Sequence, residues 1–475
     1  MTAGRPDTLS PDARRAVPAM GRLLELEAAR ILARRHGQAA LRRTLETLLA
    51  EIRASLRDGA SPLCEPSIIL QEAGARLETA ACAGMRGVIN ATGVVIHTNL
   101  GRAPLAPEAV HEMVQAAGYV SIEMELDSGA RGSRQDHLEP LIRELTAAES
   151  ALVVNNCASA VLLALAAIGE GAPVIVSRGE LVEIGGGFRV PEIIAQGGCR
   201  LVEVGATNRT HIRDYERALA DNPDARIILR THPSNFRMTG FTSRPDLAAL
   251  ARLARSRGVL LIEDLGGGAL VDLSSYGLAD EPTVQESLAA GVDLVLFSAD
   301  KLLGGPQAGI AAGQTKLIEV MERHPLARAM RLDKLSLAAL KATLELYRPP
   351  SDPLRAIPAL RMLTEPEAVV RARAERLLTL LQAGPEPRGV QLDLVATQSF
   401  AGGGAMPMHP LPGAALRLSS RTLSGSTLAR RLRLGEPSVV GRIVRDDVLL
   451  ELRTVNEQEL GALAVSIQQA TAFSD

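Results

Sequence analysis

Short apolar runs alternate with amphipathic stretches through the middle of the chain. The runs lie at residues 151–154, 174–176, 201–204, 227–229, 259–262 and 294–297. Each run is too short for a helix and is bounded by polar or glycine-containing loops, which is typical of buried strands. Helical spacing of apolar residues separates several of them, as at 246–257. Strands that alternate with helices predict an α/β fold, with a mostly parallel sheet covered by helices on both faces.

The two ends of the chain carry other patterns. From Met20 to Leu56 apolar residues recur at helical spacing with a break at Gly37, and short strands at 88–89 and 94–96 are expected to enter the large domain. A proline-rich linker at 348–353 precedes a helix and several strands. We therefore predict an N-terminal helical domain (1–83), a large α/β domain (84–347) and a smaller C-terminal α+β domain (348–475).

Composition agrees with a large protein of several domains. The 475 residues are 46% hydrophobic, which is ample for a sizeable core. The first 20 residues are charged and lack an apolar centre, so we expect no signal peptide, and no stretch is apolar enough to span a membrane. The four cysteines are far apart with no CxxC pair. We therefore expect a cytoplasmic protein without a structural metal site.

Charge is distributed unevenly along the chain. The net charge is −2, but residues 1–60 hold eleven arginines against seven acidic residues. Aromatic residues are scarce, so stacking on splayed bases is not expected to dominate any nucleic-acid binding. Contacts with the phosphates of a folded RNA would suit this segment, and an arginine-rich solvated helix face is the alternative.

Lys301 follows the apolar run at 294–297 and precedes Gly304, Gly305 and Pro306, which predict a loop. It is therefore expected just past the end of a buried strand, where open α/β sheets place their ligands. A lysine in that position suggests a Schiff base with pyridoxal phosphate, and a solvated loop lysine is the alternative. Asp264 ends another predicted strand before a run of glycines, and a carboxylate there would keep the pyridine nitrogen protonated.

Other segments suggest an anion site beside these two residues. Small residues after the strand at 151–154 begin a helix, whose free N–H groups would bind the cofactor phosphate with help from Ser298. The candidates in this segment are Asn156, Cys157 and Ala158. His232 and Asn235 follow another strand and are candidate cofactor-pocket residues, although His232 is equally compatible with an ordinary loop. Arg131 and Arg134 lie in a glycine-containing loop, where a planar guanidinium suits phosphate-like anions and surface pairing is the alternative.

Four long segments resemble one known family, the bacterial selenocysteine synthases, which are L-seryl-tRNA(Sec) selenium transferases. They read GVINATGVVIHTNLGRAPL (87–105), SRGELVEIGGGFRVPEI (177–193), FSADKLLGGPQAGI (297–310) and PSVVGRIVRDDVLLELRTV (437–455). The resemblance runs from about residue 20 to the C-terminus. The family pattern Asn-Asn-Asn-Ala-Ala-Ala stands here with Cys157 and Ser159, which leaves the backbone anion site intact and puts only a side-chain role of residue 157 in doubt.

The resemblance implies a fold-type-I pyridoxal phosphate enzyme that converts seryl-tRNA(Sec) to selenocysteinyl-tRNA(Sec) with selenophosphate, through an aminoacrylyl-tRNA. It implies that the N-terminal domain binds the tRNA and that Arg328 and Arg331 help to hold the anionic selenium donor. Arg102, Arg131 and Arg134 are the other candidates for this selenophosphate site. It also implies a homo-oligomer, a pentamer of dimers with active sites at dimer interfaces.

Two other functions are compatible with the residues themselves. A pyridoxal phosphate-dependent ammonia-lyase, or another small-molecule β-eliminating enzyme, would use the same Lys301 and Asp264. An RNA-binding protein with an inactive cofactor site is the other alternative, and retention of both residues argues against it.

Overall fold

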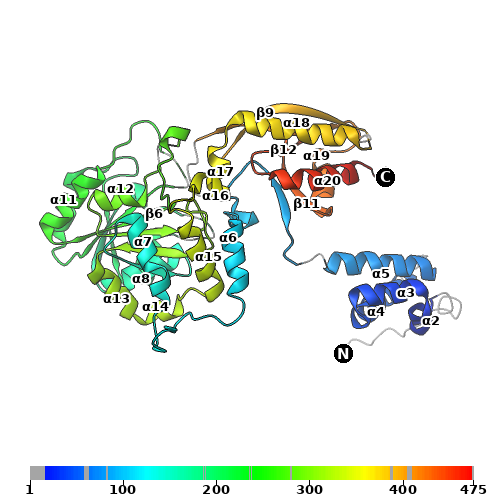
Figure 1. The fold of residues 1–475 in the computed structure, drawn as a ribbon, viewed down its shortest axis with the longest axis horizontal. Coiled ribbons are helices and arrows are strands. Elements are labelled where there is room, and N and C mark those ends of the chain that lie inside the picture. Colours follow the sequence, from blue (N-terminus) through cyan, green and yellow to red (C-terminus); the bar gives the residue numbers. More distant parts are fainter. Residues whose placement is uncertain are drawn as a thin grey trace. The chain divides into compact units, whose positions relative to one another are not determined.

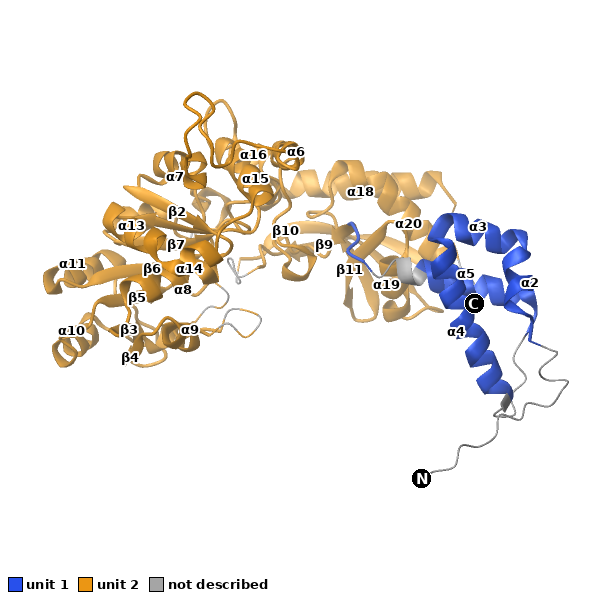
Figure 2. Cartoon of the chain, turned by 90° about the horizontal axis from the view of Figure 1, so that it is seen from below, with its two compact units in different colours: residues 1–87 blue, residues 88–475 orange. Residues whose placement is uncertain are grey.

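The computed structural model describes residues 17–57, 64–81, 84–183, 185, 187, 189–234, 236, 238–278, 281–385, 389–403 and 409–472. The chain forms two compact units, residues 1–87 and 88–475, which are coloured separately in Figure 2. No helix among the described residues is long and apolar enough to cross a membrane.

The first unit is helical, as the spacing of apolar residues predicts. Its helices are α2 (Met20–Glu25), α3 (Glu27–His36), α4 (Gln38–Arg57) and α5 (Pro66–Ala81). Gly37 separates α3 from α4 with a φ of +88°, a conformation that glycine adopts without strain. Leu41 and Leu45 of α4 are fully buried against Leu23, Ile69 and Leu70 from the other helices.

A seven-stranded sheet forms the centre of the second unit (Figure 1). Its strands run in the order β2-β8-β7-β6-β5-β3-β4, with bounds Ser150–Val154, Gly309–Gly313, Leu294–Ser298, Leu260–Gly266, Ile227–Thr231, Pro173–Ser177 and Arg200–Val204. The strands β7, β6, β5, β3 and β4 are parallel, and β8 runs antiparallel to both β7 and β2. The predicted mostly parallel sheet is therefore confirmed.

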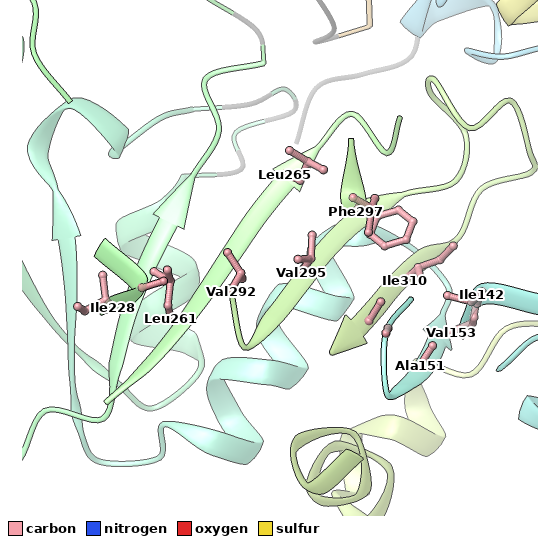
Figure 3. Packing of buried hydrophobic residues seen from close by; sticks show 14 of the residues in the cluster. Ile142, Ala151, Val153, Ile228, Leu261, Leu265, Val292, Val295, Phe297 and Ile310 are labelled. Atoms are coloured by element: carbon pink, nitrogen blue, oxygen red, sulfur yellow. The ribbon is translucent and has the colours of Figure 1, made fainter. Parts of the chain in front are cut away.

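Helices cover both faces of this sheet, because successive residues of each strand point to opposite sides. On β5, Ile228 belongs to one apolar cluster while Ile227 and Leu229 belong to another. Figure 3 shows part of the first cluster, with Phe297 of β7 near Ile310 of β8. Helices α7 (Glu139–Thr146), α10 (Ile212–Asp221), α11 (Leu247–Arg257), α12 (Val284–Ala289) and α15 (Lys334–Glu345) pack on that face, and α8 (Cys157–Ile168), α9 (Val190–Gln196), α13 (Thr315–Arg323) and α14 (Pro325–Ala329) pack on the other.

A smaller five-stranded sheet lies in the same unit, with strand order β1-β11-β12-β10-β9. Its strands are β1 (Val88–Ala91), β9 (Val390–Ser399), β10 (Leu411–Ser420), β11 (Ser438–Val444) and β12 (Asp447–Glu451). Helices α18 (Glu367–Ala383), α19 (Gly425–Leu434) and α20 (Leu460–Ala472) share an apolar core with it, and α6 (Pro107–Gln115), α16 (Pro353–Ala356) and α17 (Pro358–Thr364) complete the unit.

The position of β1 differs from the expectation that residues 84–105 enter the large domain. Val88–Ala91 pairs in parallel with β11, and Val94 forms a bridge with Phe400. The segment therefore begins as part of the smaller sheet before the chain reaches the large one. A pairing between residues about 350 positions apart leaves no local trace in the sequence.

Candidate active site

Three neighbouring strands bring polar groups to one edge of the large sheet. Lys301 lies in the turn directly after β7 and is 5% exposed. Asp264 lies on β6, next to an irregularity in the pairing between Asp264 and Gly266, and is 4% exposed. The N–H of His232, which follows β5, donates to the carbonyl of Asp264 at 2.8 Å. As predicted, these three residues lie at or just after the ends of strands.

The Asp264 carboxylate has a single side-chain hydrogen bond within the described residues. The Cys157 thiol donates to its Oδ1 at 3.6 Å. Burial raises the pKa of Asp264 to about 6, while the charge of Lys301 and the thiol hydrogen bond lower it. Burial likewise raises the pKa of Cys157 far above its usual value, so residue 157 stays a neutral donor at physiological pH. The carboxylate keeps room for one more strong donor, such as a protonated ring nitrogen.

The N-terminus of α8 lies beside this pair. The Asn156 side chain accepts from the N–H of Ser159 at 2.8 Å and caps the helix, and Cys157 is its first residue. The first N–H groups of a helix have no partner inside it, so those of Cys157 and Ala158 are available to an anion. Ser298, at the end of β7, hydrogen-bonds to Cys157 and is itself buried.

One strand is shaped to admit this helix terminus. A Cβ at Gly309 of β8 would overlap the carbonyl of Asn156, so only glycine fits there. The residues of this region therefore fit pyridoxal phosphate. They supply a buried amine, a buried carboxylate with free acceptor capacity, and helix N–H groups with a serine hydroxyl for a phosphate.

The five arginines that were predicted to bind an anion do not all lie together: three contact Glu123 and two lie elsewhere. Arg131, Arg134 and Arg331 all contact Glu123, at 3.1, 2.5 and 3.5 Å. The hydrogen bonds from Arg134 and Arg131 lower the pKa of Glu123, and burial of the carboxyl opposes them. Arg134 also donates to the carbonyl of Leu332, and its side chain is only 13% exposed, against 80% for Arg131. Arg331 pairs with Val154 through the backbone, which places it at the end of β2 beside α8.

Arg102 and Arg328 lie outside the Glu123 cluster. Arg102 adopts a φ of +66° and donates to Asp300, the residue before Lys301, at 2.7 Å. Arg328 lies in the last turn of α14 and is exposed, with no ion pair among the described residues. Asn235, the remaining candidate, lies outside the described residues.

His232 also lines a cavity of about 300 Å³. Its walls include His232, Ser234, Arg209, Arg244 and Glu281. Glu180 also lines it and contacts Arg230 at 3.1 Å and Arg244 at 3.6 Å. Neither Glu180 nor Glu281 is among the predicted site residues, although Glu180 lies in the segment 177–193 that resembles the family.

Comparisons with known proteins agree along nearly the whole chain. A family model described as L-seryl-tRNA selenium transferase matches residues 88–456. The L-seryl-tRNA(Sec) selenium transferase of Hyphomonas neptunium is 45% identical over 461 residues, which covers 96% of this chain and 98% of that protein. The enzyme of the same name from Moorella thermoacetica is 45% identical over 457 residues, 96% of each chain.

A solved structure of D-glucosaminate-6-phosphate ammonia-lyase is also similar. Its TM-score is 0.57 with 21% identity, over 83% of this chain and 98% of that chain. Identity this low shows a shared fold alone, so the likeness confirms the predicted α/β architecture and leaves the chemistry to the residues.

Proposed function

Because this chain belongs to the L-seryl-tRNA selenium transferase family, we propose that it replaces the hydroxyl of a seryl residue on tRNA(Sec) with selenium, taken from selenophosphate in the cytoplasm. Its cofactor is pyridoxal phosphate. The observation that carries the proposal is the convergence of buried Lys301, buried Asp264 and the N-terminus of α8 at one sheet edge. When bound, the cofactor supplies an electron-poor ring that accepts the electron pair left when serine loses its α-proton.

Each residue of the site then has a distinct task. Lys301 Nζ would bind the cofactor aldehyde carbon and later take the α-proton of the seryl group. The Asp264 carboxylate would hold a proton at the pyridine nitrogen, and the Cys157 thiol fixes that carboxylate by donating to it. The first N–H groups of α8 and the Ser298 hydroxyl would bind the phosphate.

Selenophosphate is a compact anion, and Arg102, Arg328 and Arg331 are the groups we assign to it. Two features of their placement support this. Arg102 forms an ion pair with Asp300, which precedes Lys301 in the chain. The backbone bridge between Arg331 and Val154 places Arg331 at the end of the strand that leads into α8.

The helical first unit is the part we assign to tRNA. Some of its arginines pair with acids, as Arg35 does with Glu78. Others on its surface have no ion pair among the described residues, including Arg34, Arg43 and Arg53. We also propose the oligomer of this family, a pentamer of dimers, with active sites at the dimer interfaces.

The test uses purified protein with seryl-tRNA(Sec) and radioactive selenophosphate, and Lys301→Ala as control. We expect selenium on the tRNA-bound amino acid with the unaltered protein and none with the variant. Release of pyruvate and ammonia from free amino acids, without transfer to tRNA, would instead identify a small-molecule lyase.

A further inference from the structure

Glu281 is a buried acid that the reaction described above does not use. It is 7% exposed, and its Oε1 has no hydrogen-bond partner within the described part of the chain. Burying an ionised carboxyl group costs free energy. A carboxyl group buried in this way therefore either stays neutral or has a function at a ligand site.

The carboxyl group of Glu281 and the amine of Lys301 each approach one of two consecutive glycines. A Cβ at Gly267 would overlap Glu281 Oε1, so the carboxyl rests directly against that backbone. A Cβ at the preceding Gly266 would lie 3.8 Å from Lys301 Nζ and 3.3 Å from Ser234 Oγ. Glu281 and Ser234 both line the 300 Å³ cavity.

The surroundings of Glu281 keep it neutral. Burial raises its pKa to about 8, and the charge of Lys301 opposes this rise without cancelling it. The other titratable groups that line the same cavity are Glu180, Arg209, His232, Arg244 and His409. At pH 7 Glu281 thus holds a proton that it can donate, and Lys301 is near enough for its charge to act on this carboxyl.

We propose that Glu281 is the general acid that protonates the departing serine hydroxyl, an assignment that rests on the proposed function. Lys301 Nζ takes the α-proton, and the electron pair of the Cα–H bond becomes the second bond between Cα and Cβ. The Cβ–O bond breaks with its electron pair on oxygen, and the Glu281 proton joins that oxygen to form water. Glu281 is left as a carboxylate and Lys301 as an ammonium group.

This reaction needs a proton donor other than Lys301 for its leaving group. Hydroxide is a poor leaving group, and Lys301 has to remain ready to return a proton to Cα once selenium has bonded to Cβ. An acid that supplies the leaving-group proton typically contributes about 10²–10⁴-fold in rate. Solvent in the cavity reprotonates Glu281 for the next cycle.

The experiment compares two leaving groups in single turnover. Glu281→Gln keeps the shape of the neutral side chain but cannot donate this proton. We expect about 10²–10⁴-fold slower elimination from seryl-tRNA(Sec). With tRNA(Sec) carrying β-chloroalanine, whose chloride needs no proton, we expect a loss of a few-fold at most. Exchange of the α-proton with deuterated solvent should stay near normal.

The matched control is Glu263→Gln, which removes another buried acid of raised pKa, from β6. It should change neither elimination by more than a few-fold. A second measurement needs no catalysis. The infrared carbonyl band of a protonated carboxyl should disappear in Glu281→Gln, and in the unaltered cofactor-free protein it should titrate near pH 8.

The outcomes separate the alternatives. Equal slowing with both leaving groups, or no slowing with either, overturns the general-acid role, as does an infrared band that titrates near pH 4 to 5. Failure of the unaltered protein to convert seryl-tRNA(Sec), with normal elimination from another substrate, refutes the proposed function and leaves the infrared result to stand on its own.

Discussion

Replacing Glu281 with glutamine is expected to flatten the pH dependence of stability in the cofactor-free protein. Folding raises the pKa of this group from its usual 4.5 to about 8. Between these values the folded chain holds a proton that the unfolded chain has released. The stabilising contribution is therefore fully present below about pH 4.5 and is lost as the pH rises through about 8.

The size of the effect follows from the two pKa values. At about 1.4 kcal/mol for each pH unit, a rise from 4.5 to about 8 corresponds to about 5 kcal/mol as an upper figure. For a folded part of the chain as long as residues 88–475, each kcal/mol of stability changes the Tm by about 1–2 °C, by extension from smaller domains. Between pH 5 and pH 8.5 the unaltered protein should therefore lose about 5 °C more than Glu281→Gln does.

The assay is a series of thermal melts of both cofactor-free proteins across that pH range. Asp264 and every other titrating group are present in both, so the difference between the curves isolates Glu281. Glu216→Gln, on the exposed side of α10, is the control and should run parallel to the unaltered protein. Parallel curves for Glu281→Gln would mean that the carboxyl ionises normally, and the reasoning about its burial would be wrong.

Three other variants test the remaining parts of the site. Asp264→Asn should keep the cofactor absorbance but slow elimination by about 10²-fold or more in single turnover, because a neutral ring accepts electrons poorly. Arg331→Ala should leave elimination intact and raise the half-saturating selenophosphate concentration about 10–100-fold, the worth of one charge-assisted hydrogen bond, and an unchanged donor requirement would remove Arg331 from that role. Glu180→Ala should cost about 3–5 kcal/mol in urea unfolding because it leaves Arg230 buried without its partner, whereas a loss below about 1 kcal/mol would show that Arg230 finds another one.

The sequence predicted the placement of those candidate site residues that follow regular elements. Lys301 and Asp264 were predictable because each comes at the end of an apolar run, and parallel strands gather their carboxyl ends at one edge. The helix that starts at Cys157, where we propose that the cofactor phosphate binds, was predictable from a run of small residues after a strand. These signals come from residues that are close together in the sequence, so the sequence alone is enough to predict the placement.

What the sequence did not reveal depends on tertiary contacts. Strand β8 reads GIAAG and lacks branched residues at its ends, because Gly309 must pass the carbonyl of Asn156 and Gly313 that of Asp293. Glu281 lies in a loop, and only the fold brings its carboxyl against Gly267. No spacing rule links these residues along the chain.

Arg134 and Arg331 differ in how many hydrogen bonds and ion pairs they already form with other residues. Arg134 is largely buried and uses its donors on Glu123 and on the carbonyl of Leu332, so an anion would have to break several bonds to engage it. Arg331 makes the longest contact with Glu123, at 3.5 Å, and its side chain is 42% exposed. Glu123 and Arg134 thus form a fixed support from which Arg331 can turn toward an incoming anion at little cost. It follows that Arg134→Ala should lower stability while Arg331→Ala affects donor binding.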